Sequence, residues 1–175
     1  MRNNYSFQTL CNTVERSGKK SFQGPQLLRM LLSILRFLWC LPTELLALFL
    51  LMLWRSDAAD RGQIREAHVF LLPGPERRGL SLGRFIFVWS RKKPRLHDKE
   101  AWEDLLTHEY GHTVQALYLG PVYLIVIGLP SLIWAGLPHL RRMRRRRGIS
   151  YYQLYTERWA DSLGQKALRR PLYRL

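Results

Sequence analysis

The pentapeptide His108-Glu109-Tyr110-Gly111-His112 is the most informative stretch of this 175-residue chain. If the segment is helical, its two histidines project from one face, one turn apart, and can hold a single Zn²⁺ ion. Glu109 follows the first histidine and can lie beside the metal, where a general base is needed to take a proton from water. The alternative is a surface helix with two unrelated histidines. We predict a zinc site with Glu109 as its base.

A zinc site of this kind needs a third protein ligand and one open position. The candidate side chains are Glu157, Asp161, His139, His97 and His68. Glu157 is the best of them because it shares a helix face with Asp161, and a second carboxylate can orient a ligand histidine. The small residues Ala160 and Gly164 would let this helix approach the Gly111 side of the first helix closely. The alternative is a solvated helix face whose acidic residues pair with neighbouring basic ones.

Together the two segments resemble the gluzincin metallopeptidases, in which HExxH is followed by an ExxAD element. Here these elements are HEYGH and Glu157-Arg158-Trp159-Ala160-Asp161-Ser162-Leu163-Gly164. The likeness is to the membrane-embedded branch that includes the prenyl-protein endopeptidases and the bacterial heat-shock membrane peptidases. The chain is also similar to small bacterial membrane proteins, of unassigned activity, in which HEYGH is followed by LGP.

This resemblance implies a peptidase in which His108, His112 and Glu157 bind zinc. It also implies that Glu109 is the base and that Asp161 supports a ligand histidine. The chain departs from the membrane-embedded branch because it is short and lacks most of the transmembrane helices of that branch. It has no LDG or NPDG element, so the intramembrane site-2 type is not expected.

Composition and charge indicate a lipid surface as partner. The length suits one domain with a modest core, and 47% hydrophobic residues exclude a disordered chain. The net charge is +15, from 28 Lys and Arg against 13 Asp and Glu, and suggests lipid headgroups or nucleic acid as partner. Two apolar stretches favour lipid. The expected partners are therefore a bilayer with anionic headgroups and a peptide or protein substrate, and not nucleic acid.

The first half of the chain is expected to begin with a tail and a membrane segment. Residues 1–26 are polar and predict a flexible tail. The apolar segment 27–54 is long enough to cross a bilayer core as a helix. Pro42 would kink that helix, and Glu44 would be costly in lipid unless paired or neutral. An interfacial or hairpin arrangement of the segment is the alternative.

The expected elements around the site are a β-hairpin and two helices. Strand-like runs at 67–72 and 80–88, separated by turn residues, predict a β-hairpin over 66–90. Strand 80–88 could pair with an extended substrate, or it could merely cover the site helix. The active-site helix is expected over 98–119, and the helix of the third ligand over 150–170.

The second apolar stretch, 121–138, decides whether Glu157 can reach the histidines. A single crossing would put Glu157 on the opposite side of the membrane. The stretch is short and has Gly128-Leu129-Pro130 in its middle, so we predict a re-entrant hairpin that turns there, buried against 27–54. The arginine run that follows is expected to be a lipid-facing, cytoplasmic flank, with nucleic-acid binding as the alternative. Its residues are Arg141, Arg142, Arg144, Arg145, Arg146 and Arg147.

The whole sequence predicts an α+β fold, mostly helical and membrane-associated, with a β-hairpin before the active-site helix. One metallopeptidase-like domain is expected over 27–175, at a bacterial cytoplasmic membrane with the site on the cytoplasmic side. The expected activity is zinc-dependent hydrolysis of peptide bonds. An oxyanion helper can come from Tyr151, Tyr152, Tyr155 or His139. The rivals are a non-catalytic zinc-binding membrane protein with a structural or protein-binding role, and a membrane-tethered nucleic-acid binder.

Overall fold

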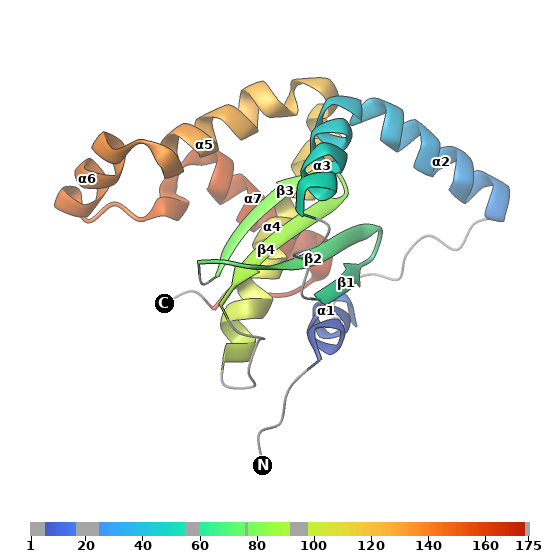
Figure 1. The fold of residues 1–175 in the computed structure, drawn as a ribbon, viewed down its shortest axis with the longest axis horizontal. Helices are drawn as coiled ribbons and strands as arrows, with labels where there is room; N and C mark the ends of the chain where they lie inside the picture. Colours follow the sequence, from blue (N-terminus) through green and yellow to red (C-terminus); the bar gives the residue numbers. More distant parts are fainter. Residues whose placement is uncertain (1–5, 17–24, 55–59, 76, 92–97, 174–175) are drawn as a thin grey trace, which may run out of the picture.

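The computed structural model describes residues 6–16, 25–54, 60–75, 77–91 and 98–173 (Figure 1). Helices predominate over one four-stranded sheet, so the predicted α+β class is confirmed. The elements are, in chain order, α1 (Phe7–Arg16), α2 (Gln26–Trp39), α3 (Leu41–Trp54), β1 (Asp60–Ile64), β2 (Ala67–Pro73), β3 (Arg78–Leu82), β4 (Phe85–Ser90), α4 (Lys99–Leu119), the 3₁₀ turn η2 (Gly120–Val122), the π-helical turn η3 (Leu124–Gly128), α5 (Leu129–Gly136), α6 (Pro138–Arg147), the 3₁₀ turn η4 (Tyr151–Gln153) and α7 (Tyr155–Leu168).

The sheet has the strand order β1-β2-β4-β3, which differs from the predicted hairpin over 66–90. β2 and β4 pair in parallel, whereas β1–β2 and β3–β4 are antiparallel pairs. The run 80–88, predicted as one strand, turns at Gly83 and Arg84 and contributes to both β3 and β4. Gly83 has a φ of +59°, which glycine adopts without strain. The prediction of a single strand over 80–88 was wrong because the turn at Gly83 and Arg84 lacks the Asn-Gly or Asp-Gly pair, which is the strongest sequence signal of a tight hairpin turn.

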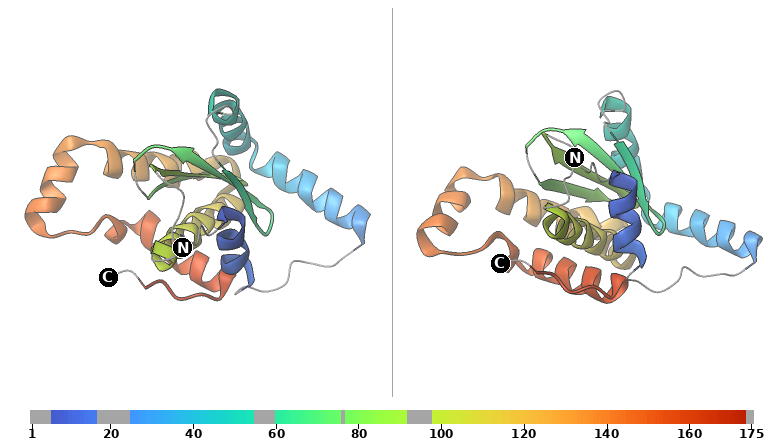
Figure 2. Two further views of the ribbon diagram at one scale, coloured as in Figure 1. Left: turned by 60° about the horizontal axis from the view of Figure 1, so that its bottom comes forward. Right: turned by 90° about the horizontal axis from the view of Figure 1, so that it is seen from below.

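The two faces of the sheet pack against different helices, as the views in Figure 2 show. Alternate residues of a strand point to opposite faces. Val69 and Leu71 of β2 pack with α1, α4 and α7, whereas Phe70 and Leu72 pack with α3. The larger core lies on the first of these faces and includes Trp102 of α4. α4 is therefore enclosed between the sheet and α7.

The helix α1 overturns part of the predicted flexible tail over 1–26. Four of its residues recur every three or four positions and share one helix face: Phe7, Leu10, Cys11 and Val14. All four are buried in the larger core. The tail prediction was wrong here because the polar composition hid this apolar face. Residues 1–5 and 17–24 lie outside the described residues.

The predicted membrane segment 27–54 is not one helix but two, α2 and α3, which meet at 88°. Pro42 lies in the first turn of α3, where its missing N–H breaks no helical hydrogen bond. The buried Glu44 carboxylate accepts hydrogen bonds from the backbone N–H and the guanidinium of Arg84, at 3.1 Å each. This ion pair ties the bend between α2 and α3 to the turn between β3 and β4.

Within the described ranges, no single helix has both the length and the apolar character to cross a membrane. Two bent pairs of helices meet that requirement by length and composition. The first is α2 with α3. The second joins the α4–η2 segment to the η3–α5 segment, at an angle of 119°.

The second apolar stretch, 121–138, does not reverse direction at the predicted position; the chain bends before it. The helix predicted over 98–119 is confirmed as α4, and the chain bends directly after it, where Gly120 has a φ of +51°. The predicted reversal at Gly128-Leu129-Pro130 was wrong. The backbone stays right-handed helical there, and the proline is accommodated at the start of α5.

The chain returns to the core after α6 instead. α6 ends at Gly148, whose φ is +63°, and η4 then leads into α7. α7 lies within the range 150–170 predicted for the helix of the third ligand. It runs beside α4, so the segment between the two helices leaves the core and comes back to it (Figure 1).

Candidate metal centre

The helix that carries HEYGH, α4, is buried along most of its length. Its residues from Trp102 to Thr113 are all buried, and they include His108, Glu109 and His112. A helix that is buried all round lies inside a domain, so the alternative of a surface helix with unrelated histidines is wrong. Polar and charged side chains at such a depth need specific partners.

α7 approaches α4 closely because both helices have small residues where they meet. A side-chain carbon at Gly111 would collide with the backbone carbonyl of Ala160. One at Gly164 would collide with the backbone carbonyl of Thr107. The predicted close approach of the two helices is thus confirmed. It brings the acidic residues of α7 next to the histidines of α4.

Three buried side chains converge into a group that can hold a metal ion: His108, His112 and Glu157. One ligand atom from each lies within 4.8 Å of the other two. The Oε2 atom of Glu157 is 3.1 Å from His108 Nε2 and 3.5 Å from His112 Nε2. We call these three residues the metal group. The structure therefore brings Glu157 to the histidine pair.

The other candidates for the third ligand lie elsewhere. Asp161 contacts the histidine nitrogen that faces away from the metal group. His68 lies on β2, where its ring packs against Phe85. His139 is exposed in α6. His97 lies outside the described residues.

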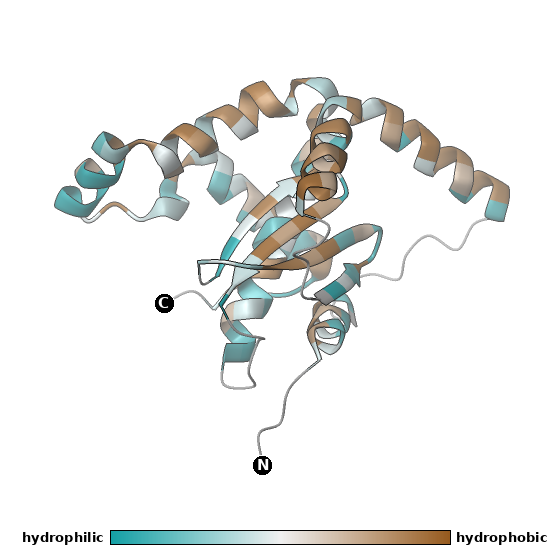
Figure 3. Cartoon of the chain, in the orientation of Figure 1, coloured by the Kyte–Doolittle hydropathy of each residue, from teal (hydrophilic) through white to brown (hydrophobic). Residues whose placement is uncertain are grey.

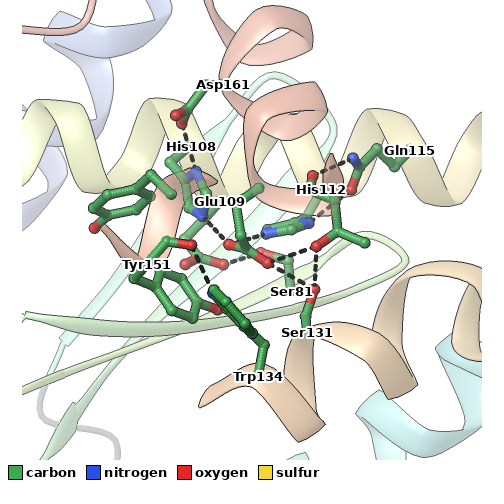
Figure 4. Close-up of polar contacts among 12 residues, drawn as sticks. Ser81, His108, Glu109, His112, Gln115, Ser131, Trp134, Tyr151 and Asp161 are labelled. Carbon is green, nitrogen blue, oxygen red and sulfur yellow. Dashed lines mark hydrogen bonds and ion pairs between the residues drawn. The ribbon is translucent and has the colours of Figure 1, made fainter. Parts of the chain in front are cut away.

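Each histidine is oriented by a hydrogen bond at its outer nitrogen (Figure 4). His108 Nδ1 is 2.7 Å from Asp161 Oδ1, and His112 Nδ1 is 2.7 Å from Gln115 Oε1. The Gln115 amide donates in turn to the carbonyl of Thr156 in α7, which directs its oxygen toward His112. With the proton on each Nδ1, each Nε2 lone pair points into the metal group, as a metal ligand requires.

The Glu157 carboxylate fits the role of a ligand. Its Oε1 atom accepts hydrogen bonds from Ser131 at 2.6 Å and Thr156 at 3.1 Å. Its Oε2 atom is buried and has no hydrogen-bond partner among the described residues. Burial raises the pKa of Glu157, whereas imidazoles that carry a proton on Nε2 lower it more, so the net direction is downward. Two imidazole nitrogens and one carboxylate oxygen are a donor set that suits zinc and related divalent metals.

Glu109 lies beside the metal group without belonging to it. Its Oε2 atom accepts a hydrogen bond of 2.7 Å from the hydroxyl of Ser81 in β3. β3 passes so close that a side-chain carbon at Gly79 would collide with the Glu109 carboxylate. Glycine at this position makes room for the carboxylate, which is held between α4 and β3.

A cavity of about 440 Å³ adjoins the metal group and Glu109. Its walls come from β3, α4, η3, α5, α6 and η4. The ring of Tyr152 packs edge-on against His108 and against the ring of Tyr151. Burial raises the pKa of Tyr151, and the charges of Glu157 and Glu109 raise it further. The phenol therefore stays protonated and can donate a hydrogen bond.

The remaining predicted residues divide between the cavity and the surface. Tyr155 donates a 2.6 Å hydrogen bond to the carbonyl of Val126, and neither it nor His139 is among the described residues that line the cavity. Two residues of the arginine run, Arg141 and Arg144, do line it. The others are exposed: Arg142, Arg145, Arg146 and Arg147.

Sequence reasoning missed four polar residues around the site: Ser81, Gln115, Ser131 and Thr156. Gln115 could have been found, because it lies three residues after His112 on the same helix and faces the same side. The other three come from β3, α5 and the start of α7, and no local pattern marks them. They reach the site only through the tertiary fold.

Comparison with known proteins adds nothing to these assignments. No family model, no curated protein and no solved structure matches the chain. The chemistry open to the site follows from its own residues.

Proposed function

We propose that this protein is a membrane-associated zinc metallopeptidase that hydrolyses peptide bonds. One observation carries the proposal: the buried metal group lies beside a cavity into which the Glu109 carboxylate also faces. Three protein ligands with one open position are typical of catalytic zinc sites, whereas structural sites have four protein ligands. A bound zinc ion would supply Lewis acidity, which lowers the pKa of a water molecule and polarises a carbonyl.

Glu109 carries the proton in the proposed reaction. Its carboxylate accepts a proton from the attacking water as the water oxygen bonds to the scissile carbonyl carbon. It then delivers this proton to the amine nitrogen as the C–N bond breaks, so one water is consumed and an acid and an amine are released. The hydrogen bond from Ser81 holds the carboxylate in position for both transfers.

In this proposal the peptide substrate lies along β3. β3 is an edge strand of the sheet, and the consecutive residues 77–82 line the cavity. An extended peptide can add to such an edge through backbone hydrogen bonds. β4 cannot serve in this way, because it is paired with β2 on one side and β3 on the other. We therefore narrow the predicted substrate strand from 80–88 to β3.

Tyr151 is the best-placed helper for the oxyanion that develops on the scissile carbonyl. It lines the cavity beside Glu157, and its protonated phenol is a hydrogen-bond donor. Tyr152 also lines the cavity, but its ring is packed against His108. We therefore propose that Tyr152 holds the His108 ring in position and does not bind the oxyanion.

The membrane part of the proposal rests on the apolar surface of α2, α3 and α5. α2 and α5 bury none of their residues, and the hydropathy colouring of Figure 3 marks hydrophobic residues along all three helices. The more exposed side chains of these helices are Leu27, Leu35, Met52 and Leu132. Exposed apolar surface of this extent is typical of an interaction site, and the arginines of α6 suit anionic headgroups. Arginine-rich flanks stay on the cytoplasmic side, so we place the site there.

Flotation with lipid vesicles tests the membrane part. Vesicles that contain anionic lipid should carry the protein upward in a density gradient, and vesicles of neutral lipid should carry less. Protein that stays at the bottom with both kinds of vesicle would overturn this part of the proposal.

Glu109→Gln tests the reaction. This variant should bind zinc as the wild type does but cleave a proteome-derived peptide mixture at least about 100-fold more slowly, because the proton carrier is lost. Glu100→Gln, at an exposed position in the first turn of the same helix, is the matched control and should retain both properties. Cleavage is read by mass spectrometry, and zinc binding by competition with a chelating dye.

Two results would contradict the peptidase. Equal cleavage by Glu109→Gln and wild type would remove Glu109 as the base. A zinc-loaded wild type that cleaves nothing in the mixture would favour the alternative, a non-catalytic zinc-binding membrane protein with a structural or protein-binding role.

A further inference from the structure

Arg144 differs from the rest of the arginine run in its aromatic neighbours. Its guanidinium lies 5.0 Å from the ring centroid of Trp134 and 5.3 Å from that of Tyr151. The two aromatic residues are joined, because the Trp134 indole N–H donates to the carbonyl of Tyr151 (Figure 4). A guanidinium stacked on rings keeps the edge that carries its N–H donors in a defined direction. Arg144 is thus held in place by η4 and α5.

The Nε donor of Arg144 has no hydrogen-bond partner within the described part of the chain. This atom is buried, and no described carboxylate pairs with the guanidinium. Arg170 shows the contrast, since its guanidinium forms ion pairs with Glu103 and Asp104. A half-buried cation without an anion is unfavourable. An anionic group that entered the cavity would complete its hydrogen bonding.

The lining of the cavity combines positive charge with an apolar wall. Four arginines line it: Arg77, Arg78, Arg141 and Arg144. Glu109 is the only acidic residue among the described residues of the lining. The apolar wall comes mainly from Leu80, Ile127, Leu132 and Ala135. Positive charge beside low-dielectric walls attracts and concentrates anionic ligands.

We propose that this cavity binds a carboxylate of the substrate on Arg144, beside an apolar residue of the same peptide. The inference rests on the proposed peptidase function and names its substrate class. The planar guanidinium can bind a carboxylate through two parallel N–H···O bonds. Tyr151 contacts Arg144, and both residues line the same cavity as His108 and His112, so the anchored charge lies in the cavity that adjoins the metal group.

This role separates Arg144 from the membrane flank to which the whole run was assigned from sequence. Arg146 lies in the same turn of α6, but it is exposed and is not among the residues of the cavity. Two sources can supply the carboxylate: an Asp or Glu side chain of the peptide, or its C-terminus. Both present the same planar anion to Arg144. A lipid headgroup is a different ligand, and it is an outcome of the test.

The test compares wild type, Arg144→Gln, Arg144→Lys and the matched control Arg146→Gln, all zinc-loaded. The cleavage sites of the wild type in the peptide mixture fix the preferred sequence. Synthetic peptides of that sequence are then made in pairs, with Glu against Gln at the enriched position and with a C-terminal acid against an amide. The readout is the ratio of kcat/KM between the members of each pair.

Wild type should favour the carboxylate member of one pair by about 10- to 100-fold, the usual contribution of a charged, two-point hydrogen bond. That ratio should fall close to one in Arg144→Gln, take an intermediate value in Arg144→Lys and stay unchanged in Arg146→Gln. The pair that responds identifies the source of the carboxylate. The lysine variant keeps the charge, so it also separates loss of the contact from a disturbed fold.

The proposal is overturned if the wild type cleaves peptides with no carboxylate preference, or if Arg144→Gln keeps that preference. It is also overturned if Arg144→Gln alters only the binding of anionic vesicles, which would make Arg144 a headgroup ligand. If the wild type cleaves no peptide, the same pairs are measured as labelled ligands by fluorescence anisotropy. Binding that depends on the carboxylate and on Arg144 would then support this inference while the peptidase fails, and binding without that dependence would refute it.

Discussion

Gly164→Ala should weaken the fold and the metal group together. An added methyl at this position would collide with the backbone carbonyl of Thr107, and it would lie 3.4 Å from the backbone nitrogen of Gly111. A helix backbone cannot move aside as the tip of a side chain can, so α7 must shift away from α4. Glu157 and Asp161 are on α7 and would shift with it.

Two opposing effects set the size of the change. Alanine favours a helix interior over glycine by about 1 kcal/mol. Forcing a methyl into a packed interface costs about 1–3 kcal/mol, with the upper end expected against backbone. The net loss in the free energy of unfolding is then about 1–2 kcal/mol, which lowers Tm by about 2–8 °C in a chain of this size.

Gly136→Ala is the matched control. Gly136 is also helical, at the end of α5, but a methyl there meets nothing within 4 Å. This variant lacks the unfavourable contact and should gain up to about 1 kcal/mol from helix propensity alone. The two alanine substitutions should therefore change Tm in opposite directions.

The assay is thermal unfolding in detergent, followed by circular dichroism with a chelator present, together with a zinc titration. Zinc affinity should fall about tenfold or more in Gly164→Ala, because the orientation of the ligands is disturbed, and should stay at the wild-type value in Gly136→Ala. If Gly164→Ala unfolds at the wild-type temperature and binds zinc equally well, close packing of α4 on α7 does not hold the site together.

Two further substitutions probe single contacts. Asp161→Asn keeps a hydrogen-bond acceptor near His108 but removes the negative charge of the carboxylate, so zinc affinity should fall about 10- to 100-fold. An unchanged affinity in a dye-competition titration would show that Asp161 does not strengthen zinc binding through His108. Arg84→Met leaves the Glu44 carboxylate, whose side chain is 0% exposed, without its cation, and should lower the free energy of unfolding by about 3–5 kcal/mol in a urea titration. Adding Glu44→Gln should recover part of that loss, and a loss below about 1 kcal/mol would contradict the importance of the ion pair.

The apolar stretch 27–54 and the sheet show where local patterns mislead. Residues 27–54 form one apolar run in sequence, yet α2 and α3 meet at 88°, with Glu44 held by a partner forty residues away. The run 80–88 is mostly apolar and was predicted as one strand, yet Gly83 divides it between an edge strand and a central one. Both outcomes depend on contacts with distant segments, which no local window contains.

What the sequence determined by itself is the local chemistry of two helices. The spacing in HEYGH puts two imidazoles and a carboxylate on one stretch of α4. On α7, helical spacing places the carboxylates of Glu157 and Asp161 on one face. The small residues Ala160 and Gly164 lie near that face and allow close packing. These properties follow from helical geometry over a few residues, so they could be predicted before any contact was known. Glu157, which the structure brings to the two histidines, could also be chosen on this basis.

Only the tertiary structure decided how these parts meet. It placed a bend at Gly120 and the return at Gly148, and not a reversal at Gly128-Leu129-Pro130, so that α7 lies beside α4. It set Ser81 against the proposed base and turned Arg144, one arginine of a run, toward the cavity. The physical reason is that each of these positions results from packing between segments far apart in the chain. The backbone bends and the side-chain contacts of such segments depend on one another, so neither can be predicted from a short stretch of sequence.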